Sequence, residues 1–383
     1  MAKRDINKAR FDEKTSLKLD IFRECFRAWF PVLANDIYTQ RIYIFDLFAG
    51  SGTDEDGEYG SPLILLDEAK GDKKQFCHFI HTKEKDIHFI FNEKLKDKSA
   101  LLEKNITEYF NQCEKECDYE KCIYRGKYEI KNDSFINIFN DPNFEKILQN
   151  KTYGKFLLLD QYGFKEIGDD VFLKLISYPK TDFIFFIASN YIKRFKNLPA
   201  VTDYFQKIGN IDFDESQPKE CHRIIANYYR SLLPSGKEYY LHHFSYLKKT
   251  NYYGLIFGTN HTYGMEKFLK VCWNYDPLSG ESTENINNDF EKGSLFFDPS
   301  QSNKKQTIKE LLKNEILNSN IRTNLDGFKF VLSKGGETTL YIECINELIR
   351  TKKVTIEGRF NQQKTSIHRL KDDKIYKINI INQ

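Results

Sequence analysis

A short apolar run near the start of the chain leads directly into glycines. The run is IYIFDLF at 42–48, and AGSG follows at 49–52. Because glycine has no side chain, the backbone of this glycine loop (residues 46–52) can approach a ligand closely. We expect it to lie under the methionine end of S-adenosylmethionine (SAM), with a plain strand-to-helix turn as the alternative. A phosphate-binding loop is excluded, since G-x-x-x-x-G-K-[ST] is absent. The expected cofactor contacts here are Asp46, Phe48, Ala49, Gly50 and Gly52.

Two acids follow the next two apolar runs. Glu93 lies at the end of HFIFNEK (88–94), where a carboxylate can accept hydrogen bonds from both ribose hydroxyls of a nucleoside. It comes about 40 residues after the glycines rather than the usual ~20, which fits an extended loop between them. Asp133 and Ser134 follow the run at 128–133, where an acid can accept from an adenine amino group. The alternatives are a solvated acid at 93 and a helix-capping acid at 133.

The tetrapeptide DQYG at 160–163 follows a fourth apolar run. The order of the runs places it beside the cofactor, at the edge where α/β proteins form their sites. An acid and an aromatic ring there suit transfer to a nucleobase amine: the acid and a backbone carbonyl accept from the amine, and the ring stacks on an extruded base. A turn acid and a core-covering ring are the alternative. The candidate catalytic residues are Asp160, Gln161 and Tyr162.

A further polar segment follows the fifth apolar run. Asn190, Lys193 and Arg194 lie there and can meet a phosphate or a base edge, or simply begin a solvated helix.

The cysteines and histidines give no metal pattern. Eight cysteines in 383 residues are too sparse for a disulfide scaffold. Cys113, Cys117 and Cys122 form a cluster, but C-x3-C-x4-C matches no established zinc or iron spacing. We therefore expect no metal site, and an ordinary surface insertion at about 95–127.

The elements that must position these residues alternate along the chain. A helix at 15–35 comes first, and Ser61 as N-cap with Pro62 predicts the start of the helix after the glycine loop. Five strands separated by helices precede two strands close enough to pair as a hairpin. This order predicts an α/β, Rossmann-like class I methyltransferase fold, a seven-stranded sheet with a C-terminal antiparallel hairpin. The expected strands are 42–48, 88–94, 128–133, 155–163, 182–190, 238–247 and 252–260.

The pattern changes near the C-terminal end. Polar stretches at 274–294 and 298–305 suggest a linker. Helices at 307–317 and 338–351, followed by strands at 352–358 and 374–380, resemble a winged helix-turn-helix. We therefore expect a methyltransferase-like domain over 1–297 and a small winged-helix domain over 304–383.

Composition alone would have argued against a nucleic-acid partner. The 58 Lys and Arg nearly cancel the 55 Asp and Glu, leaving +3, whereas residues 304–383 alone hold 16 and 9, a charge of +7, so the rest carries −4. A basic tail suits contact with phosphates. A hydrophobic fraction of 40% with 15% aromatics excludes a disordered chain. No apolar stretch approaches a membrane span and the charged start is no signal peptide, so we expect a cytoplasmic protein with reduced thiols.

The glycine loop together with DQYG resembles the amino-group methyltransferases, which carry an F-x-G-x-G loop and a D-P-P-Y-type tetrapeptide. More narrowly, the chain resembles the three-Cys-motif partner family over roughly 15–295. The resemblance implies a SAM-dependent methyltransferase-like protein, a three-cysteine, radical-SAM-like protein as a partner, and for some members a mobile or defence gene neighbourhood. Gln161 departs from the family, which has Pro there, so the carbonyl facing the target amine is less rigidly aimed. The matching positions are Lys18, Trp29, 46–52, 55–57, 60–62, 160–163, Asn190, Arg194, 263–267 and Trp273.

These observations predict a SAM-dependent methyltransferase that acts on DNA or RNA, at an exocyclic adenine or cytosine amine. The alternative is a catalytically weak or inactive SAM-binding scaffold whose winged helix binds nucleic acid or a protein partner. A methyltransferase of small molecules or proteins is a third interpretation, in which residues 304–383 would not matter for activity.

Overall fold

The computed structural model describes residues 10–11, 13–71, 77, 79–80, 85–117, 122–161, 168–188, 218–248, 251–287, 302–358, 368 and 374–381. The chain divides into two compact units, Met1–Ala188 (unit 1) and Ser189–Gln383 (unit 2). The predicted domain boundary between 297 and 304 remains a prediction.

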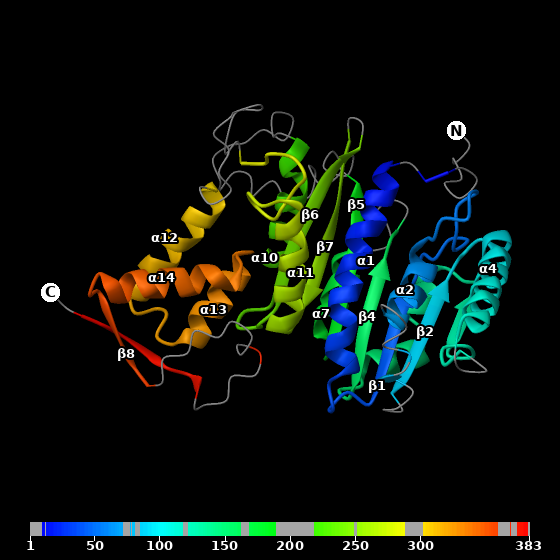
Figure 1. Ribbon diagram of the computed structural model, residues 1–383, viewed down its shortest axis with the longest axis horizontal. Coiled ribbons are helices and arrows are strands. Elements are labelled where there is room, and N and C mark those ends of the chain that lie inside the picture. Colours follow the sequence, from blue (N-terminus) through cyan, green and yellow to red (C-terminus); the bar gives the residue numbers. More distant parts are fainter. Residues whose placement is uncertain are drawn as a thin grey trace. The chain divides into compact units, whose positions relative to one another are not determined.

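Unit 1 is a parallel sheet with helices between its strands (Figure 1). β1 lies between β2 and β4, β3 lies outside β2, and β5 lies outside β4, all in parallel register. β1, β2, β4 and β5 are runs of mostly aliphatic and aromatic residues that are largely buried, as expected when helices cover a parallel sheet, whereas the short edge strand β3 is partly exposed. The strands are β1 (Arg41–Asp46), β2 (Asp86–Asn92), β3 (Tyr128–Lys131), β4 (Tyr153–Leu159) and β5 (Thr181–Ala188). The helices are α1 (Glu13–Ala34), α2 (Ser61–Lys70), α4 (Lys96–Lys115), α5 (Phe135–Phe139), α6 (Pro142–Gln149) and α7 (Asp169–Ser177).

Helix α1 is held to the sheet by aromatic side chains. The Trp29 ring lies 4.7 Å from that of Phe156 on β4, and its indole N–H donates to Asp182 on β5 at 2.6 Å. The helix predicted over 15–35 is confirmed as Glu13–Ala34, and it continues through Pro31. A proline late in a helix removes one backbone hydrogen bond, and the packing of the helix against the sheet offsets that loss.

Helix α2 begins one residue differently from the prediction. Gly60, not Ser61, is the N-cap, and Ser61 and Pro62 are the first helical residues. The Ser61 hydroxyl instead interacts with the carboxylate of Asp46 at the end of β1.

The predicted sheet is confirmed. Its seven strands run in the order β3-β2-β1-β4-β5-β7-β6. β6 (Tyr240–Lys248) and β7 (Asn251–Thr259) pair antiparallel, from Tyr240 opposite Thr259 to Lys248 opposite Asn251. The strand order reverses between β1 and β4, and open α/β sheets bind ligands at the carboxyl ends of the strands beside such a reversal.

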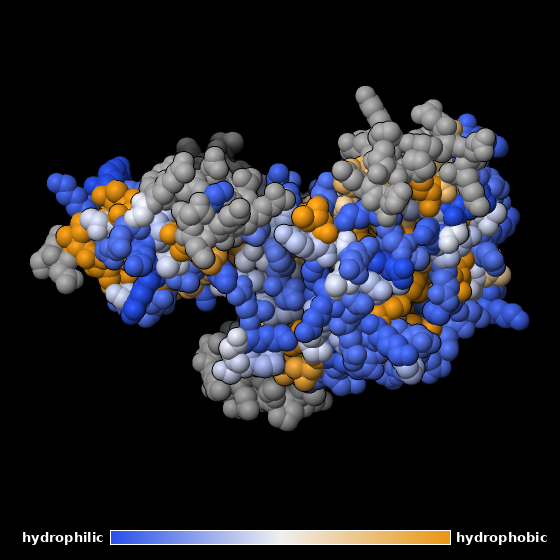
Figure 2. Space-filling model, turned by 90° about the horizontal axis from the view of Figure 1, so that it is seen from below, coloured by the Kyte–Doolittle hydropathy of each residue, from blue (hydrophilic) through white to orange (hydrophobic). Residues whose placement is uncertain are grey.

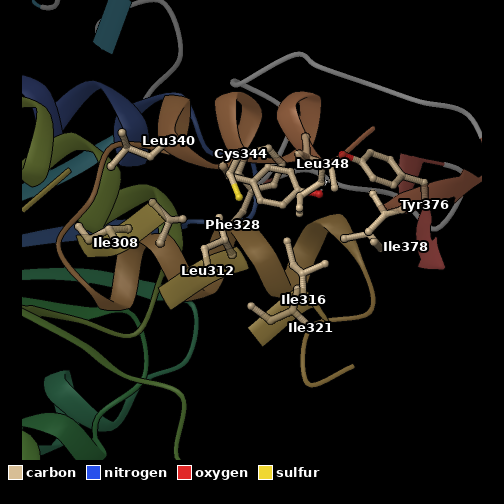
Figure 3. Packing of buried hydrophobic residues seen from close by; sticks show 14 residues of the cluster. Ile308, Leu312, Ile316, Ile321, Phe328, Leu340, Cys344, Leu348, Tyr376 and Ile378 are labelled. Atoms are coloured by element: carbon tan, nitrogen blue, oxygen red, sulfur yellow. Dashed lines mark hydrogen bonds between the residues drawn. The ribbon is translucent and has the colours of Figure 1, made fainter. Parts of the chain in front are cut away.

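Unit 2 combines the β6–β7 hairpin with the C-terminal elements. Its C-terminal helices and strands enclose a core of buried side chains (Figure 3). In this core the hydroxyls of Tyr341 and Tyr376 are 2.9 Å apart. An isolated antiparallel bridge joins Thr323 to Lys377. Thr323 lies in the connection between α12 and α13, the first two of these helices along the chain. The remaining elements are η4 (Pro218–Glu220), α10 (Cys221–Ser231), α11 (Thr262–Tyr275), α12 (Asn303–Leu317), α13 (Asn324–Ser333), α14 (Thr338–Arg350), β8 (Val354–Glu357) and β9 (Lys377–Ile380).

The expectation of a linker at 274–294 is wrong for its described part, 274–287. The buried carboxylate of Asp276 accepts from the amides of Leu278, Ser279 and Glu281, so the segment folds around one side chain. Its polar side chains form hydrogen bonds to the backbone and to each other. Amino-acid composition alone cannot distinguish such a segment from a solvated linker.

A buried ion cluster lies at the end of that segment. The Glu281 carboxylate accepts from Lys304 at 2.7 Å and from Arg223 at 2.5 Å, and Lys304 also donates to the Ser279 carbonyl. Burial alone would raise the pKa of Glu281, but Lys304, His243 and Arg223 hold it well below its usual range. These ion pairs join the segment at 276–287 to α10 and α12 within unit 2.

Among the described residues, no helix combines the length and the apolar character needed to cross a membrane. Figure 2 shows one face of the molecule, on which hydrophilic side chains predominate and apolar ones form separate patches.

Candidate functional site

The glycine loop lies at the carboxyl end of β1 in a conformation that favours glycine. Gly50 has φ of 64° and Gly52 of 85°, in the left-handed region that other residues rarely adopt. A Cβ on Gly52 would lie 2.9 Å from the Leu102 side chain of α4. The Asn105 amide of the same helix donates to the Ser51 carbonyl at 2.7 Å, so α4 braces the loop from one side.

Glu93 and the glycine loop meet, as the sequence predicts for two parts of one site. The Glu93 carboxylate accepts from the Gly50 amide at 3.0 Å and from the Leu95 amide at 2.8 Å. The carboxylate is therefore fixed between the ends of β1 and β2. An acid bound in this way is positioned by the backbone instead of moving freely in solvent.

Asn92, the last residue of β2, joins three strand ends and is not among the site residues predicted from the sequence. Its side-chain amide donates to the carbonyls of Leu47 and Asp133 at 3.2 and 3.0 Å, and its oxygen accepts from the Asp133 amide. The side chain is 1% exposed, so each of these bonds replaces one to water. The only sequence signal was a polar residue closing an otherwise apolar run.

Asp46 is a buried acid with an incomplete set of partners. Its Oδ1 accepts from the Phe48 amide at 3.2 Å, whereas Oδ2 is buried with no hydrogen-bond partner. Burial raises the pKa of Asp46 to about 7, against the opposing effects of Ser61 and the Phe48 amide. A buried carboxylate oxygen without a donor is costly, which points to a ligand group that supplies one.

Asp160, the candidate catalytic acid, is paired with a lysine from α1. The Lys18 ammonium contacts the Asp160 carboxylate and lies 5.0 Å from the centre of the Phe186 ring on β5. Both side chains are partly buried, with 18% of Lys18 and 25% of Asp160 exposed. Lys18 is one of the two residues of α1 on which the family resemblance depends, and this pair is its structural role.

Asp133 lies at the same edge but is exposed, and its carboxylate has local partners. Its Oδ1 accepts from the Ser134 amide and the Asn137 side chain, both at 2.7 Å. Ser134 is the N-cap of α5, where its hydroxyl accepts from the Asn137 amide. The helix cap is therefore Ser134 and not Asp133, and the Asp133 carboxylate remains accessible from solvent.

The aromatic side chain of the glycine loop links the β1 and β3 ends. Phe48 stacks on Phe135, with ring centroids 5.2 Å apart and an interplanar angle of 23°. Ala49 donates its amide to the Asn92 carbonyl at 2.9 Å. The structure thus brings most of the predicted cofactor contacts together: Asp46, Phe48, Ala49, Gly50, Gly52 and Glu93, with Asp133 and Ser134 beside them.

The predicted tetrapeptide is described only in part. Asp160 and Gln161 follow β4, and Gln161 is 6% exposed, so its side chain lies in the protein rather than at the surface. Tyr162, together with the polar segment of Asn190, Lys193 and Arg194, lies outside the described residues.

In the described part of the chain, no group of three or more His, Cys, Asp or Glu is arranged to hold a metal ion. Cys113 and Cys122 are buried and interact through their side chains, which together with burial raises the pKa of Cys122. They belong to the interior of unit 1.

No model of a protein family matches the chain, and no curated protein matches it either. Among solved structures it is similar to a putative methyltransferase, yhhF from Escherichia coli, at 12% identity over 61% of this chain and 85% of that one (TM-score 0.26). The N-terminal domain of human METTL16 in complex with SAH has 8% identity over 67% and 74%, with a TM-score of 0.32. M. jannaschii TYW2 in complex with AdoMet has 10% identity over 66% and 78%, with a TM-score of 0.29. At this level no residue correspondence follows, and the fold assignment rests on the strand order itself. The resemblance to the three-Cys-motif partner family, and the partner it implies, remain predictions.

Proposed function

We propose that the chain binds SAM at the carboxyl ends of β1, β2 and β3 and transfers its methyl group to an amine of a nucleic acid. The observation that carries the proposal is the Glu93 carboxylate held on the Gly50 amide, in the strand position where nucleotide-binding α/β folds place their ribose acceptor. Asn92 fixes the two strand ends that make this possible.

The residues present fit each part of the cofactor. The unpartnered oxygen of Asp46 suits the methionine ammonium, and the Glu93 carboxylate suits the ribose hydroxyls. Two apolar side chains, Leu95 at 52% and Ile136 at 41% exposure, follow Glu93 and the Asp133 turn and suit the faces of the adenine ring.

The methyl acceptor would meet Asp160. SAM supplies an electrophilic methyl group, so the protein has to present an amine nitrogen with its lone pair toward that group. A carboxylate at the end of β4, beside the strand-order reversal, can accept from the amine and fix its direction. The proposal also assigns Tyr162 to stacking on the base, as the sequence predicts.

The nucleic-acid partner is supported by the order of the C-terminal elements. Helix α12, the bridge at Thr323, helices α13 and α14, and strands β8 and β9 follow one another as helix, strand, two helices and two strands of a winged helix do. Many of the cations behind the +7 charge are already paired, among them Lys304, Lys309, Lys313, Lys329 and Lys377. Arg350, Lys352 and Lys353 are exposed at the turn from α14 to β8 and suit phosphate contact.

One observation favours the non-catalytic alternative. The Lys18 ammonium is paired with Asp160, the acid that would accept from the target amine. If this ion pair never opened, the protein would bind SAM without transferring its methyl group. Gln161 in place of proline points the same way.

Calorimetric titration of the full chain with S-adenosylhomocysteine (SAH) tests the cofactor. We expect binding that Glu93→Ala weakens by about ten-fold or more, since it loses charge-assisted bonds to the ribose. The matched control is Glu108→Ala, an exposed acid of α4, which should bind like the wild type. Wild-type protein that is folded and binds no SAH would exclude the proposal.

Transfer of tritiated methyl from SAM to total DNA and to total RNA tests the reaction. Label in either pool that Asp160→Ala abolishes supports the enzyme. If SAH binds but no pool is labelled, the scaffold is the better description.

The salt dependence of nucleic-acid binding tests the C-terminal contact. Replacing Arg350, Lys352 and Lys353 by Ala should reduce the log–log salt slope by about 2 to 3, because each cation that neutralises a phosphate contributes roughly 0.9. The control removes three exposed lysines of unit 1, Lys104, Lys115 and Lys151, and should leave the slope unchanged. Equal slopes for wild type and tail variant would place the contact elsewhere.

A further inference from the structure

Three charged side chains from three elements meet beside the strand-order reversal. Lys18 comes from α1, Asp46 from the end of β1 and Asp160 from the end of β4. Lys18 contacts Asp160, and Asp46 lies within electrostatic reach of both. The group therefore holds two carboxylates and one ammonium, of which only Asp160 and Lys18 are in direct contact.

The Lys18–Asp160 pair can be exchanged for another pair. Both side chains keep solvent access, and the Phe186 ring beneath the ammonium stabilises a cation without fixing its carboxylate partner. Because both side chains keep part of their surface in water, replacing one carboxylate partner of Lys18 by another changes the free energy only slightly.

The amino-acid end of the proposed cofactor is a zwitterion, with an ammonium and a carboxylate on one carbon. The unpartnered oxygen of buried Asp46 suits the ammonium. Since both charges sit on one carbon, the partner of the carboxylate has to lie close to Asp46. Lys18 is a cation within electrostatic range of Asp46, and its lysine stem is long enough to turn from one carboxylate to another.

We propose that Lys18 pairs with Asp160 in the cofactor-free protein and turns to the carboxylate of the cofactor's amino-acid end when the cofactor binds, which frees Asp160 to accept from the target amine. This inference rests on the proposed function and assigns its site an order, with cofactor before target. It also explains how Asp160 can take part in catalysis although Lys18 is paired with it, because the pair opens when the cofactor is bound. Lys18 is thus a positioning residue for Asp160 as well as a cofactor contact.

The test compares SAH with 5′-methylthioadenosine, which has the same nucleoside but no amino acid. Lys18→Met should bind SAH about ten-fold or more weakly, through loss of one charge-assisted contact. Asp160→Asn should bind SAH about two- to five-fold more tightly, since Lys18 no longer has to leave a carboxylate. Neither substitution should change the affinity for methylthioadenosine.

The opposite directions of the two effects separate this role from a structural one, which would weaken both ligands in both variants. The charge-matched control is Lys151→Met, exposed just before the other end of β4, and it should bind both ligands like the wild type. Wild-type protein that binds neither ligand overturns the proposed function and this inference together. SAH binding that Lys18→Met leaves unchanged, or that Asp160→Asn weakens, overturns the inference alone.

Discussion

Each unit contains a lysine–carboxylate pair, and the two pairs differ in every respect that decides their use. In unit 1, Lys18 meets Asp160 with 18% and 25% of the side chains exposed. In unit 2, Lys304 meets Glu281 with 10% and 9% exposed, and the carboxylate also binds Arg223 while the ammonium also binds the Ser279 carbonyl. Among the described residues, the first pair is joined only by the Phe186 ring beside its ammonium, whereas the second belongs to a network of several charged and polar groups.

The difference shows how burial decides whether a lysine–carboxylate pair can exchange its partner or stays permanently paired. A partly exposed pair can trade its partner for a ligand because water compensates each intermediate arrangement. A buried pair cannot, since removing either member leaves an uncompensated charge in the interior. We therefore expect unit 1 to carry the ligand chemistry and the ion cluster of unit 2 to hold its loop, α10 and α12 together.

The largest expected effect is at the buried pair. Lys304→Met should lower the free energy of unfolding of unit 2 by about 3 to 5 kcal/mol, because Glu281 keeps its burial and loses a cation. The sequence has two tryptophans, Trp29 in unit 1 and Trp273 in unit 2, so urea unfolding in a Trp29→Phe background reports unit 2. Lys377→Met, at an exposed pair of the same unit, is the control and should show no change. A loss below about 1 kcal/mol would mean that the cluster is not structural.

The second effect concerns pH and Asp46. Its pKa rises to about 7 on folding, so between about pH 4 and 7 the folded protein holds this proton more tightly than the unfolded chain. Unfolding free energy should therefore fall as pH rises through that range and level off above it. Asp46→Asn removes this contribution and should gain up to about 4 kcal/mol relative to wild type between pH 4 and 8.

The readout is urea unfolding followed by Trp29 fluorescence in a Trp273→Phe background. The same substitution should abolish SAH binding, so the carboxylate that suits the proposed ligand also lowers the stability of the protein. A relative stability of the two proteins that does not vary with pH would contradict the burial of an ionisable Asp46.

A smaller effect is expected at the exchangeable pair. Lys18→Met should lower the unfolding free energy of unit 1 by about 1 kcal/mol or less, because Asp160 remains accessible to water. The same fluorescence signal of Trp29 measures it. A loss as large as that of Lys304→Met would erase the distinction between the two pairs.

The smallest effect is expected at a surface pair of the C-terminal helices. Lys313 of α12 and Glu347 of α14 are 2.6 Å apart, with 28% and 42% of their side chains exposed. Lys313→Ala should cost about 0.5 kcal/mol, measured through Trp273. Charge reversal at both positions should restore most of it, and failure to do so would mean that packing of the lysine stem dominates.

Strands β1, β2, β4 and β5 could be predicted because each is a buried, mostly apolar run. The apolar β-branched and aromatic runs around Phe45, Phe89 and Phe156 are buried. A continuous apolar run is typical of a strand covered on both faces and not of a surface element. The placement of Gly50 and Glu93 side by side was predictable as well, since a glycine after such a run and an acid after the next lie at one sheet edge.

Residues whose function depends on distant neighbours could not be predicted. Asn92 resembles a turn residue until three strand ends surround it. Helix α13 has a glycine in its interior, a weak helix signal, but a Cβ on Gly327 would lie 2.2 Å from the Tyr341 ring. The Lys18–Asp160 contact joins positions 142 residues apart, which no local pattern encodes.

Asn92 also has a consequence for how the protein is made. Its side-chain partners are the carbonyls of Leu47, 45 residues earlier, and Asp133, 41 residues later. A nascent chain that has left the ribosome only as far as Glu93 contains the glycine loop and the Leu47 carbonyl but lacks Asp133, the other partner of Asn92. If this edge binds the proposed cofactor, we expect binding only after β3 has emerged and paired, so an incomplete chain should not capture the cofactor during synthesis.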